Sequence, residues 1–324
     1  MARPSLPVRE PGAEPPATGL PVVPRPAATL LVVRDRPAPA ARPGEADRVA
    51  DTVVSGGLEV LMVRRSERAD FVGGAHVFPG GGVDPTDDVA TAGPEVAALS
   101  DEVASAVLGL APGGRAYWVA ALRECFEEAG VLLAYRGSGR SAMLSFERDE
   151  ERARYEDLRR EVNAGRLSFL DLCRGEGLQL ALDRVHYFAH WVTPAGSPRR
   201  YDTRFFVTLA PHGQSPRRDD REIVDEVWIS PEEALRRHRA GEIDVVLPTA
   251  RCLSAISGFP SAGALVEAVR RAGGAGAAEV AGHERGAEPP RPSGPPLMVR
   301  DFHGARVVLP GDPPGAAGLP PRLR

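Results

Sequence analysis

Residues 115–129, RAYWVAALRECFEEA, carry apolar and acidic side chains at helical spacing. An apolar stripe is formed by Trp118, Val119, Leu122 and Phe126. Such spacing places side chains on one side of an α-helix. Gly130 stands where a glycine commonly ends a helix in the left-handed conformation. The sequence therefore predicts a helix over 115–129 whose apolar stripe packs on the core of a folded domain.

The same segment gathers three carboxylates on one side. Glu124, Glu127 and Glu128 stand at i, i+3 and i+4 and so share one helix face, where like charges repel. Such a face is most often simply solvated. Here, however, only Glu127 has a basic residue at helical pairing distance, Arg123, and apolar residues flank the cluster. Because carboxylate oxygens are ligands that Mg²⁺ and Mn²⁺ prefer, the alternative interpretation is a divalent-metal site.

A glycine-rich segment, FPGGGVD at 78–84, precedes the helix in the chain. Successive glycines expose backbone N–H groups and let a ligand approach the main chain closely. Many turns have this composition, so the segment alone indicates little. Followed by a helix with three carboxylates, it predicts a diphosphate held between the loop and a bound metal.

The remaining apolar runs show strand and helix patterns. Strands are predicted at 27–35, 58–66, within 75–88, and in 185–194, 199–209 and 221–230. Further helices are predicted at 94–109, 146–164, 230–241, 248–257 and 261–271. Ser230, Pro231 and Glu233 form a capping box at the start of one helix. Mixed strands with helices before and after them indicate a layered α/β or α+β domain.

Composition divides the 324 residues into three parts. Residues 1–26 are rich in proline and predict a disordered tail, and residues 27–271 predict the folded domain. Residues 272–324 predict a Gly/Pro-rich linker and C-terminal tail, in which PLMVRDFHGARVVLP has the pattern of a hairpin or an added edge strand.

The chain contains no lysine, so all 40 basic residues are arginines. That excludes Schiff-base chemistry and a P-loop and leaves arginine to bind phosphate. A net charge of −4 does not favour nucleic acid as a partner. No apolar run predicts a membrane span, and the N-terminus lacks the apolar core of an export signal. We expect a cytoplasmic protein whose three separated cysteines stay reduced and form no zinc site.

The acidic segment resembles the sequence signature of the Nudix hydrolases, G-x5-E-x7-R-E-U-x-E-E-x-G-U, in which U is apolar. The matching residues are Arg123, Glu124, Cys125, Glu127, Glu128, Gly130 and Val131. Counting from Gly81, Asp87 takes the place of the first glutamate, and residues 88–122 replace the seven that follow it in the signature. This interrupted signature is similar to the split-box branch of the family, typified by the mammalian peroxisomal coenzyme A diphosphatase.

A second pattern lies upstream. Coenzyme A-type Nudix proteins carry L-L-T-x-R-x4-R-x3-G-x3-F-P-G-G-x2-D, and the positions in register are Leu61, Arg65, Gly74, Phe78, Pro79, Gly80, Gly81 and Asp84. Val63 replaces the threonine, and Asp70 replaces the second arginine. The resemblance implies a Nudix-type α/β/α sandwich with a mixed sheet and a helical insertion at 88–122. It also implies hydrolysis of coenzyme A or acyl-coenzyme A to 3′,5′-ADP and (acyl-)4′-phosphopantetheine.

The resemblance further implies roles for individual residues. Mg²⁺ or Mn²⁺ would be held by Glu124, Glu127, Glu128 and the Gly81 carbonyl. Arg123 would orient a carboxylate through a bidentate pair. Glu124 or Glu127 would accept the proton of the attacking water, with Glu222 as the alternative base. Candidates for contact with the substrate are Arg65, Arg68, Phe78, Gly80 and Arg200.

Two other functions stay open from the sequence. One is hydrolysis of ADP-ribose or another nucleotide conjugate, and the other is a non-catalytic nucleotide-binding Nudix regulator, against which the complete set of glutamates argues. His186 and His190 lie four residues apart in a predicted strand, a separation of about 13 Å, so they do not suggest a metal site. The sequence also leaves a homodimer open.

Overall fold

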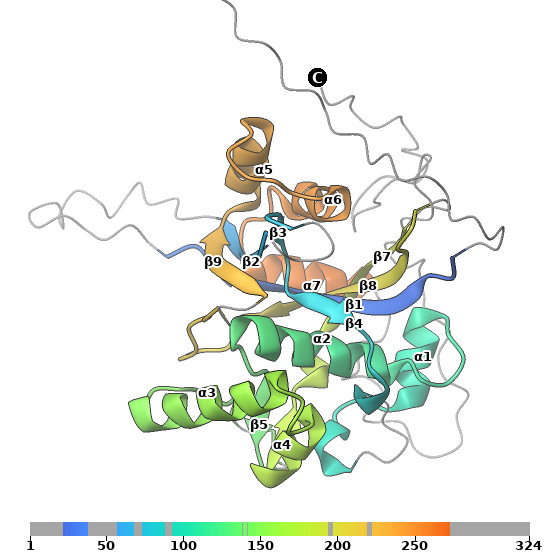
Figure 1. Cartoon of the computed structure of the whole chain (residues 1–324), viewed down its shortest axis with the longest axis vertical. Coiled ribbons are helices and arrows are strands. Elements are labelled where there is room, and N and C mark those ends of the chain that lie inside the picture. Colours follow the sequence, from blue (N-terminus) through green and yellow to red (C-terminus); the bar gives the residue numbers. More distant parts are fainter. Residues whose placement is uncertain are drawn as a thin grey trace, which may run out of the picture.

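The computed structural model describes residues 22–37, 57–67, 73–87, 93–137, 139–140, 142–193, 197–218 and 222–272. They form a mixed β-sheet with helices on both faces (Figure 1). The sheet order is β3-β2-β1-β8-β7, with β4 paired to β1 and β9 paired to β2. Its strands are β1 (Arg25–Asp35), β2 (Leu58–Arg65), β3 (His76–Val77), β4 (Gly80–Gly82), β7 (His186–Val192), β8 (Tyr201–Leu209) and β9 (Ile223–Ile229).

The central strand β1 is buried on both faces because its side chains alternate between two cores. Leu30 and Val32 belong to one apolar cluster, whereas Leu31 and Val33 belong to the other. β1 runs parallel to β8 and antiparallel to β2 and β4. A strand covered on both faces favours a continuous apolar run, and the run AATLLVV supplies it. β1 thereby forms the floor against which β4 and its glycines lie.

One face of the sheet is covered by the layer that contains the acidic helix. This layer comprises α1 (Asp101–Leu108), α2 (Arg115–Ala129), α3 (Asp149–Asn163), α4 (Phe169–Gly175) and the small sheet β5 (Ala134–Arg136) with β6 (Leu178–Leu180). The Trp118 indole in α2 packs 4.5 Å from the Phe206 ring, centroid to centroid, and donates to the Val185 carbonyl at 2.9 Å. The buried stripe therefore fixes which side of α2 faces the sheet, and leaves the glutamates at its edge.

The opposite face carries α5 (Pro231–Arg239), α6 (Leu247–Ile256) and α7 (Ala262–Ala272). The Ser230 hydroxyl accepts a hydrogen bond from the Glu233 amide at 3.3 Å, which is one half of the predicted capping box. The Glu233 carboxylate instead accepts hydrogen bonds from Arg236 and Arg237. In Figure 1, α5 and α6 stand on the side of the sheet away from α2 and α3. A cavity described below reaches the beginning of α6.

Most predicted elements are present, with differences in detail. The predicted helix 115–129 coincides with α2, whose residues 115–122 also form the end of the predicted insertion. The predicted helix 94–109 is interrupted, since a 3₁₀ turn at Pro94–Val96 precedes α1 and Ser100 caps α1 through the Val103 amide. The sequence did not predict α4, β5 or β6. The tail 1–21, the segment 273–324 with its predicted hairpin, and residues 88–92 lie outside the described residues.

Candidate active site

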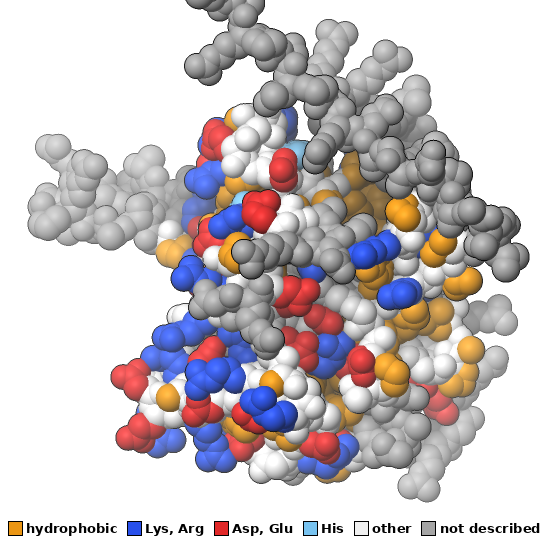
Figure 2. All heavy atoms as spheres, in the orientation of Figure 1, with side chains coloured by type: hydrophobic (Ala, Val, Ile, Leu, Met, Phe, Trp, Pro, Cys, Tyr) orange, Lys and Arg blue, Asp and Glu red, His pale blue; other side chains and the backbone are white. Residues whose placement is uncertain are grey.

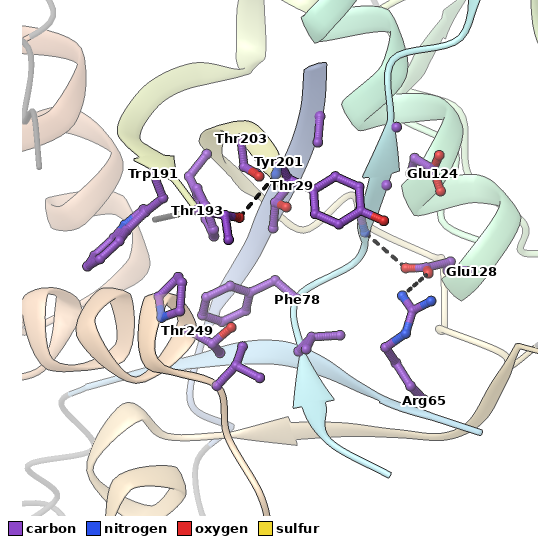
Figure 3. A pocket seen from close by; sticks show the side chains of 18 of the residues that line it. Thr29, Arg65, Phe78, Glu124, Glu128, Trp191, Thr193, Tyr201, Thr203 and Thr249 are labelled. Carbon is purple, nitrogen blue, oxygen red and sulfur yellow. Dashed lines mark hydrogen bonds and ion pairs between the residues drawn. The ribbon is translucent and has the colours of Figure 1, made fainter. Parts of the chain in front are cut away.

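A cavity of about 570 Å³ lies beside the C-terminal half of α2, β4 and the start of α6, as Figure 3 shows. That volume is within the range of small-molecule sites. The acidic side chains that border it are Glu124, Glu127, Glu128 and Glu222, and the glycines are Gly80, Gly81 and Gly82. The other polar and apolar lining residues are Ala27, Thr29, Arg65, Val77, Phe78, Trp191, Val192, Thr193, Tyr201, Thr203, Phe205, Val246, Pro248 and Thr249. The structure thus brings the predicted carboxylates and the glycine loop to one cavity.

A buried ion pair joins the two separated parts of the signature. Arg123 donates from Nε and Nη2 to the two oxygens of Asp87 at 2.8 and 2.9 Å, and from Nη2 to the Gly82 carbonyl at 2.8 Å. Asp87 is only 1% exposed. Burial raises the pKa of Asp87 although Arg123 opposes the shift, and the carboxylates hold the pKa of Arg123 above its usual value although burial opposes them. The bidentate pair anticipated for Arg123 is therefore made with Asp87.

Arg123 also contacts two of the three glutamates. Its Nη1 donates to one oxygen of Glu124 and to one oxygen of Glu127, both at 2.9 Å. The prediction that Glu124 is unpaired was therefore wrong. Asp87, which belongs to the 3₁₀ turn Pro85–Asp87 rather than to α2, draws the guanidinium across the acidic face. The second oxygen of Glu124 and of Glu127 makes no hydrogen bond within the described part of the chain.

Glu128 occupies the most enclosed position of the three. It is 4% exposed and accepts a hydrogen bond from the Gly80 amide at 2.9 Å. Arg65 lies 3.6 Å from Glu128 and 3.0 Å from Glu222, nitrogen to oxygen, so Glu128 is not unpaired either. Figure 3 shows Arg65 pointing at Glu128 across the cavity margin. Because β2 supplies Arg65, this pairing depends on the tertiary fold and not on helix spacing.

Crowding and burial make all three glutamates harder to ionise. Burial, opposed by Arg123 and assisted by Glu127, raises the pKa of Glu124 to about 7. Burial also raises the pKa of Glu127, and burial together with the nearby Glu124 raises that of Glu128 well above its ordinary value. A bound cation would favour the ionised forms, since an opposite charge stabilises a carboxylate.

Two of the three glycines of the loop, Gly80 and Gly81, have no room for a side chain. A Cβ on Gly81 would stand 2.5 Å from an oxygen of Glu124, and a Cβ on Gly80 would stand 2.5 Å from the Ala28 carbonyl oxygen. Both distances are shorter than real Cβ contacts. The glycines therefore allow the main chain of β4 to lie directly between β1 and the carboxylates of α2.

The donor chemistry suits a hard divalent cation, which takes carboxylate and carbonyl oxygens. Glu124, Glu127 and Glu128 border one cavity, and Gly81 lies against Glu124. Within the described ranges, however, no three acidic, histidine or cysteine side chains are placed to enclose a metal. Arg123 lies between Glu124 and Glu127, and Glu128 is directed to the Gly80 amide. The three glutamates therefore fit the cation by their chemistry. In this arrangement Arg123, Arg65 and the Gly80 amide contact these carboxylates.

The remaining sequence candidates have different positions. Phe78 and Arg65 line the cavity. Arg200 is not among the lining residues, because its guanidinium donates to the carbonyls of Thr193 and Val22 at 3.0 and 2.7 Å. Arg68 lies outside the residues that the structure describes. His186 and His190 lie in strand β7, as predicted.

Sequence reasoning missed one end of the cavity. Figure 3 shows Trp191 and Thr249 on the opposite side of Phe78 from Glu128 and Arg65. Trp191 comes from β7 and Thr249 from the first turn of α6. Their only sequence signal was strand and helix periodicity, which does not tell a cavity wall from a packed core.

Among the described residues, no helix is long and apolar enough to cross a membrane.

The chain has a mixed sheet between helical layers, and its glycine strand lies against a helix that carries carboxylates. This arrangement is the Nudix hydrolase fold. The crystal structure of a Nudix hydrolase from Alicyclobacillus acidocaldarius is similar, with 28% identity and a TM-score of 0.53 over 76% of this chain and 96% of that one. Residues 90–253 match the family described as the NUDT19 Nudix domain. The chain belongs to this family of Nudix hydrolases.

Curated relatives agree with this assignment. The protein named acyl-coenzyme A diphosphatase NUDT19 from Gallus gallus is 32% identical over 237 residues, which are 63% of this chain and 62% of that protein. The protein of the same name from Homo sapiens is 29% identical over 218 residues, 58% of this chain and 57% of that protein. The chain thus matches about six tenths of the length of these relatives.

Proposed function

We propose that this chain is a metal-dependent diphosphatase that hydrolyses coenzyme A or acyl-coenzyme A to 3′,5′-ADP and (acyl-)4′-phosphopantetheine. The observation that carries the proposal is the division of one cavity into two ends. The acidic side chains, Arg65 and the glycine loop form one end, and Trp191 and Thr249 belong to the other. A diphosphate joined to a long, mostly uncharged arm matches this division.

At the charged end, each residue has a task that its position supports. Glu124, Glu127 and Glu128, with the Gly81 carbonyl, would hold Mg²⁺ or Mn²⁺. When bound, such an ion neutralises a diphosphate and lowers the pKa of water. Arg123, fixed by Asp87, orients Glu124 and Glu127. Either of these two carboxylates keeps one oxygen for the proton of the attacking water, and the Gly80–Gly82 main chain lets the diphosphate approach.

The uncharged end supports an orientation for the substrate. Among the described residues that line the cavity, Arg65 is the one basic side chain, and it already lies beside Glu128 and Glu222. A 3′-phosphate placed beside Trp191 and Thr249 would therefore lose its hydration without gaining a cationic partner. The pantetheine arm suits that end better, because threonine hydroxyls can bond its amides and aromatic rings can cover its carbons. The phosphorylated adenosine then points away from the cavity.

A panel of diphosphate substrates tests the reaction. Purified protein is incubated with coenzyme A, acyl-coenzyme A esters, 3′-dephospho-coenzyme A and ADP-ribose, each with Mg²⁺ or Mn²⁺, and the products are identified by mass spectrometry. We expect 3′,5′-ADP from coenzyme A and its esters, and comparable kcat/KM for 3′-dephospho-coenzyme A. Turnover of ADP-ribose alone would refute the substrate, and tight nucleotide binding without turnover would refute catalysis.

The Trp191→Ala variant tests the orientation separately. It should raise KM for acyl-coenzyme A by about 10-fold, since a buried aromatic contact contributes roughly 1–2 kcal/mol. The same variant should leave kcat within about twofold. The proposed orientation would be refuted by two results together. Removal of the 3′-phosphate would strongly lower kcat/KM, as expected when an arginine binds that phosphate, and Trp191→Ala would change KM for none of the substrates.

A further inference from the structure

Helix α3 places one arginine against the end of the acidic helix. Most charged residues of α3 lie on the surface, where both signs are interspersed over the region that α3 occupies in Figure 1 (Figure 2). Arg159 differs from them because only 3% of its surface is exposed. A buried guanidinium needs several acceptors to offset its lost hydration. The acceptors of Arg159 therefore indicate its role in the structure.

Those acceptors include the main chain of two site residues. Arg159 donates from Nε and Nη2 to the Glu127 carbonyl at 3.0 and 2.9 Å, and from Nη2 to the Glu128 carbonyl at 2.9 Å. Its Nη1 donates to the Glu156 carboxylate at 2.8 Å. The Asn163 amide adds a further bond to the Glu127 carbonyl at 3.2 Å. One side chain thus holds the backbone of two adjacent glutamates.

These carbonyls belong to the last turn of α2, where a helix has no partners of its own for them. The next carbonyl, that of Ala129, accepts from the Arg217 amide at 2.8 Å. Gly130 is needed at this point, because its φ is +67° and a Cβ there would stand 3.1 Å from Nη1 of Arg159. The last three carbonyls of α2 are therefore held from outside the helix.

We propose that Arg159 is a positioning residue for the active site, and this inference rests on the proposed diphosphatase function. It does not line the cavity, whereas Glu127 and Glu128 do. By holding their main-chain carbonyls, Arg159 fixes where the two carboxylates stand relative to Gly80 and Gly81. Without it the last turn of α2 is free to fray, and the carboxylates lose their common orientation toward a cation.

Arg159 could act by holding the backbone or through its positive charge, and these two roles predict opposite changes in cation binding when it is replaced. If Arg159 acted only through its positive charge, removing it would tighten cation binding, because one repulsive charge would be gone. If it acts by holding the backbone, both Arg159→Met and Arg159→Lys should weaken cation binding. Lysine keeps the charge but cannot donate in the forked pattern that reaches two carbonyls.

The experiment measures Mn²⁺ binding directly, by titration with detection of free Mn²⁺ by electron paramagnetic resonance, beside kcat and KM for coenzyme A. We expect a 10-fold or larger rise in the Mn²⁺ dissociation constant and a similar fall in kcat for Arg159→Met and Arg159→Lys, with KM changed less. Asn163→Ala, which loses one bond, should fall between them and the unmodified protein. The matched control is Arg160→Gln, which removes an exposed arginine that pairs with Asp157 on the same helix.

Circular dichroism and thermal unfolding identify variants that do not fold. If Arg159→Met does not fold, Mn²⁺ binding by Arg159→Lys and Asn163→Ala tests the inference. Folded variants that bind Mn²⁺ as the unmodified protein does would overturn the inference, even if their thermal stability fell. Tighter Mn²⁺ binding in Arg159→Met would overturn it too. If the unmodified protein itself neither binds Mn²⁺ nor hydrolyses coenzyme A, the proposed function fails first.

Discussion

Replacing Asp87 by asparagine tests the buried pair that connects the glycine loop to α2. The substitution keeps the size of the side chain and one acceptor oxygen. The other oxygen, which accepts from Arg123 at 2.9 Å and from the Asp84 amide at 2.8 Å, becomes an amide nitrogen that can accept neither bond. Asp87 is 1% exposed, so water cannot take its place without a rearrangement of the loop.

The expected loss follows from these bonds. A hydrogen bond to a charged group contributes about 1.5–3 kcal/mol, and two such bonds are removed. Breaking a buried ion pair outright costs about 3–5 kcal/mol. Arg123 still reaches Glu124, Glu127 and the Gly82 carbonyl, which offsets part of the loss. We therefore expect the free energy of unfolding to fall by about 3 kcal/mol at pH 7, and turnover to fall because Arg123 shifts.

Urea unfolding at pH 7 measures the change, with Asp225→Asn on an exposed position of β9 as the control for the same chemical substitution. A double-mutant cycle with Arg123→Gln should give a coupling energy of about 2 kcal/mol. If Asp87→Asn unfolds within about 0.5 kcal/mol of the unmodified protein, the pair does not hold the loop to the helix, and the reasoning about the divided signature is refuted.

Three further predictions follow from the site and its surroundings. Glu127→Gln and Glu128→Gln should each lower kcat by about 100-fold or more while thermal unfolding stays cooperative, and unchanged rates in either variant would contradict the site. Mn²⁺ affinity should increase as pH rises from 6 to 8, because the pKa of Glu124 is raised to about 7 and a cation must displace its proton; a flat profile by titration would contradict this. Burial lowers the pKa of His186 to about 4, so the folded protein disfavours its charged form, and stability is lost as pH falls below 6.5. Between pH 7.5 and 5 that loss should be about 2 kcal/mol, and chemical unfolding of His186→Phe should lack it.

Local sequence signals predicted the parts of the site that neighbouring residues determine. The apolar stripe and Gly130 gave α2 its limits, and the spacing of Glu124, Glu127 and Glu128 gave their common face. The short apolar runs predicted the strands, because β-branched residues favour strands. These features depend on residues close together in the chain, so one sequence was enough to find them.

Helical spacing predicted the pair of Arg123 with Glu127, but the other partners of the carboxylates could not be found in this way. Arg123 lies next to Glu124 in sequence, a spacing that does not pair two side chains on a helix, until Asp87 draws its guanidinium across the face. Arg65 reaches Glu128 from another strand, and Arg159 reaches the end of α2 from another helix. Each contact needs the tertiary fold, in which burial and not helical spacing decides which groups meet.

The ends of α2 show how the helix is held in place although the signature is interrupted. At its N-terminus the Asp101 carboxylate, from the first turn of α1, accepts from the amides of Gly113 and Arg115 at 2.8 and 2.9 Å. At its C-terminus Arg159 of α3 holds the last carbonyls. A carboxylate at the positive end of the helix dipole and a guanidinium at its negative end both stabilise the helix. Helix α1, which lies in the segment between Asp87 and Arg123, therefore supplies a cap for α2, and the pair of Asp87 with Arg123 helps to align the glycine loop with the acidic face.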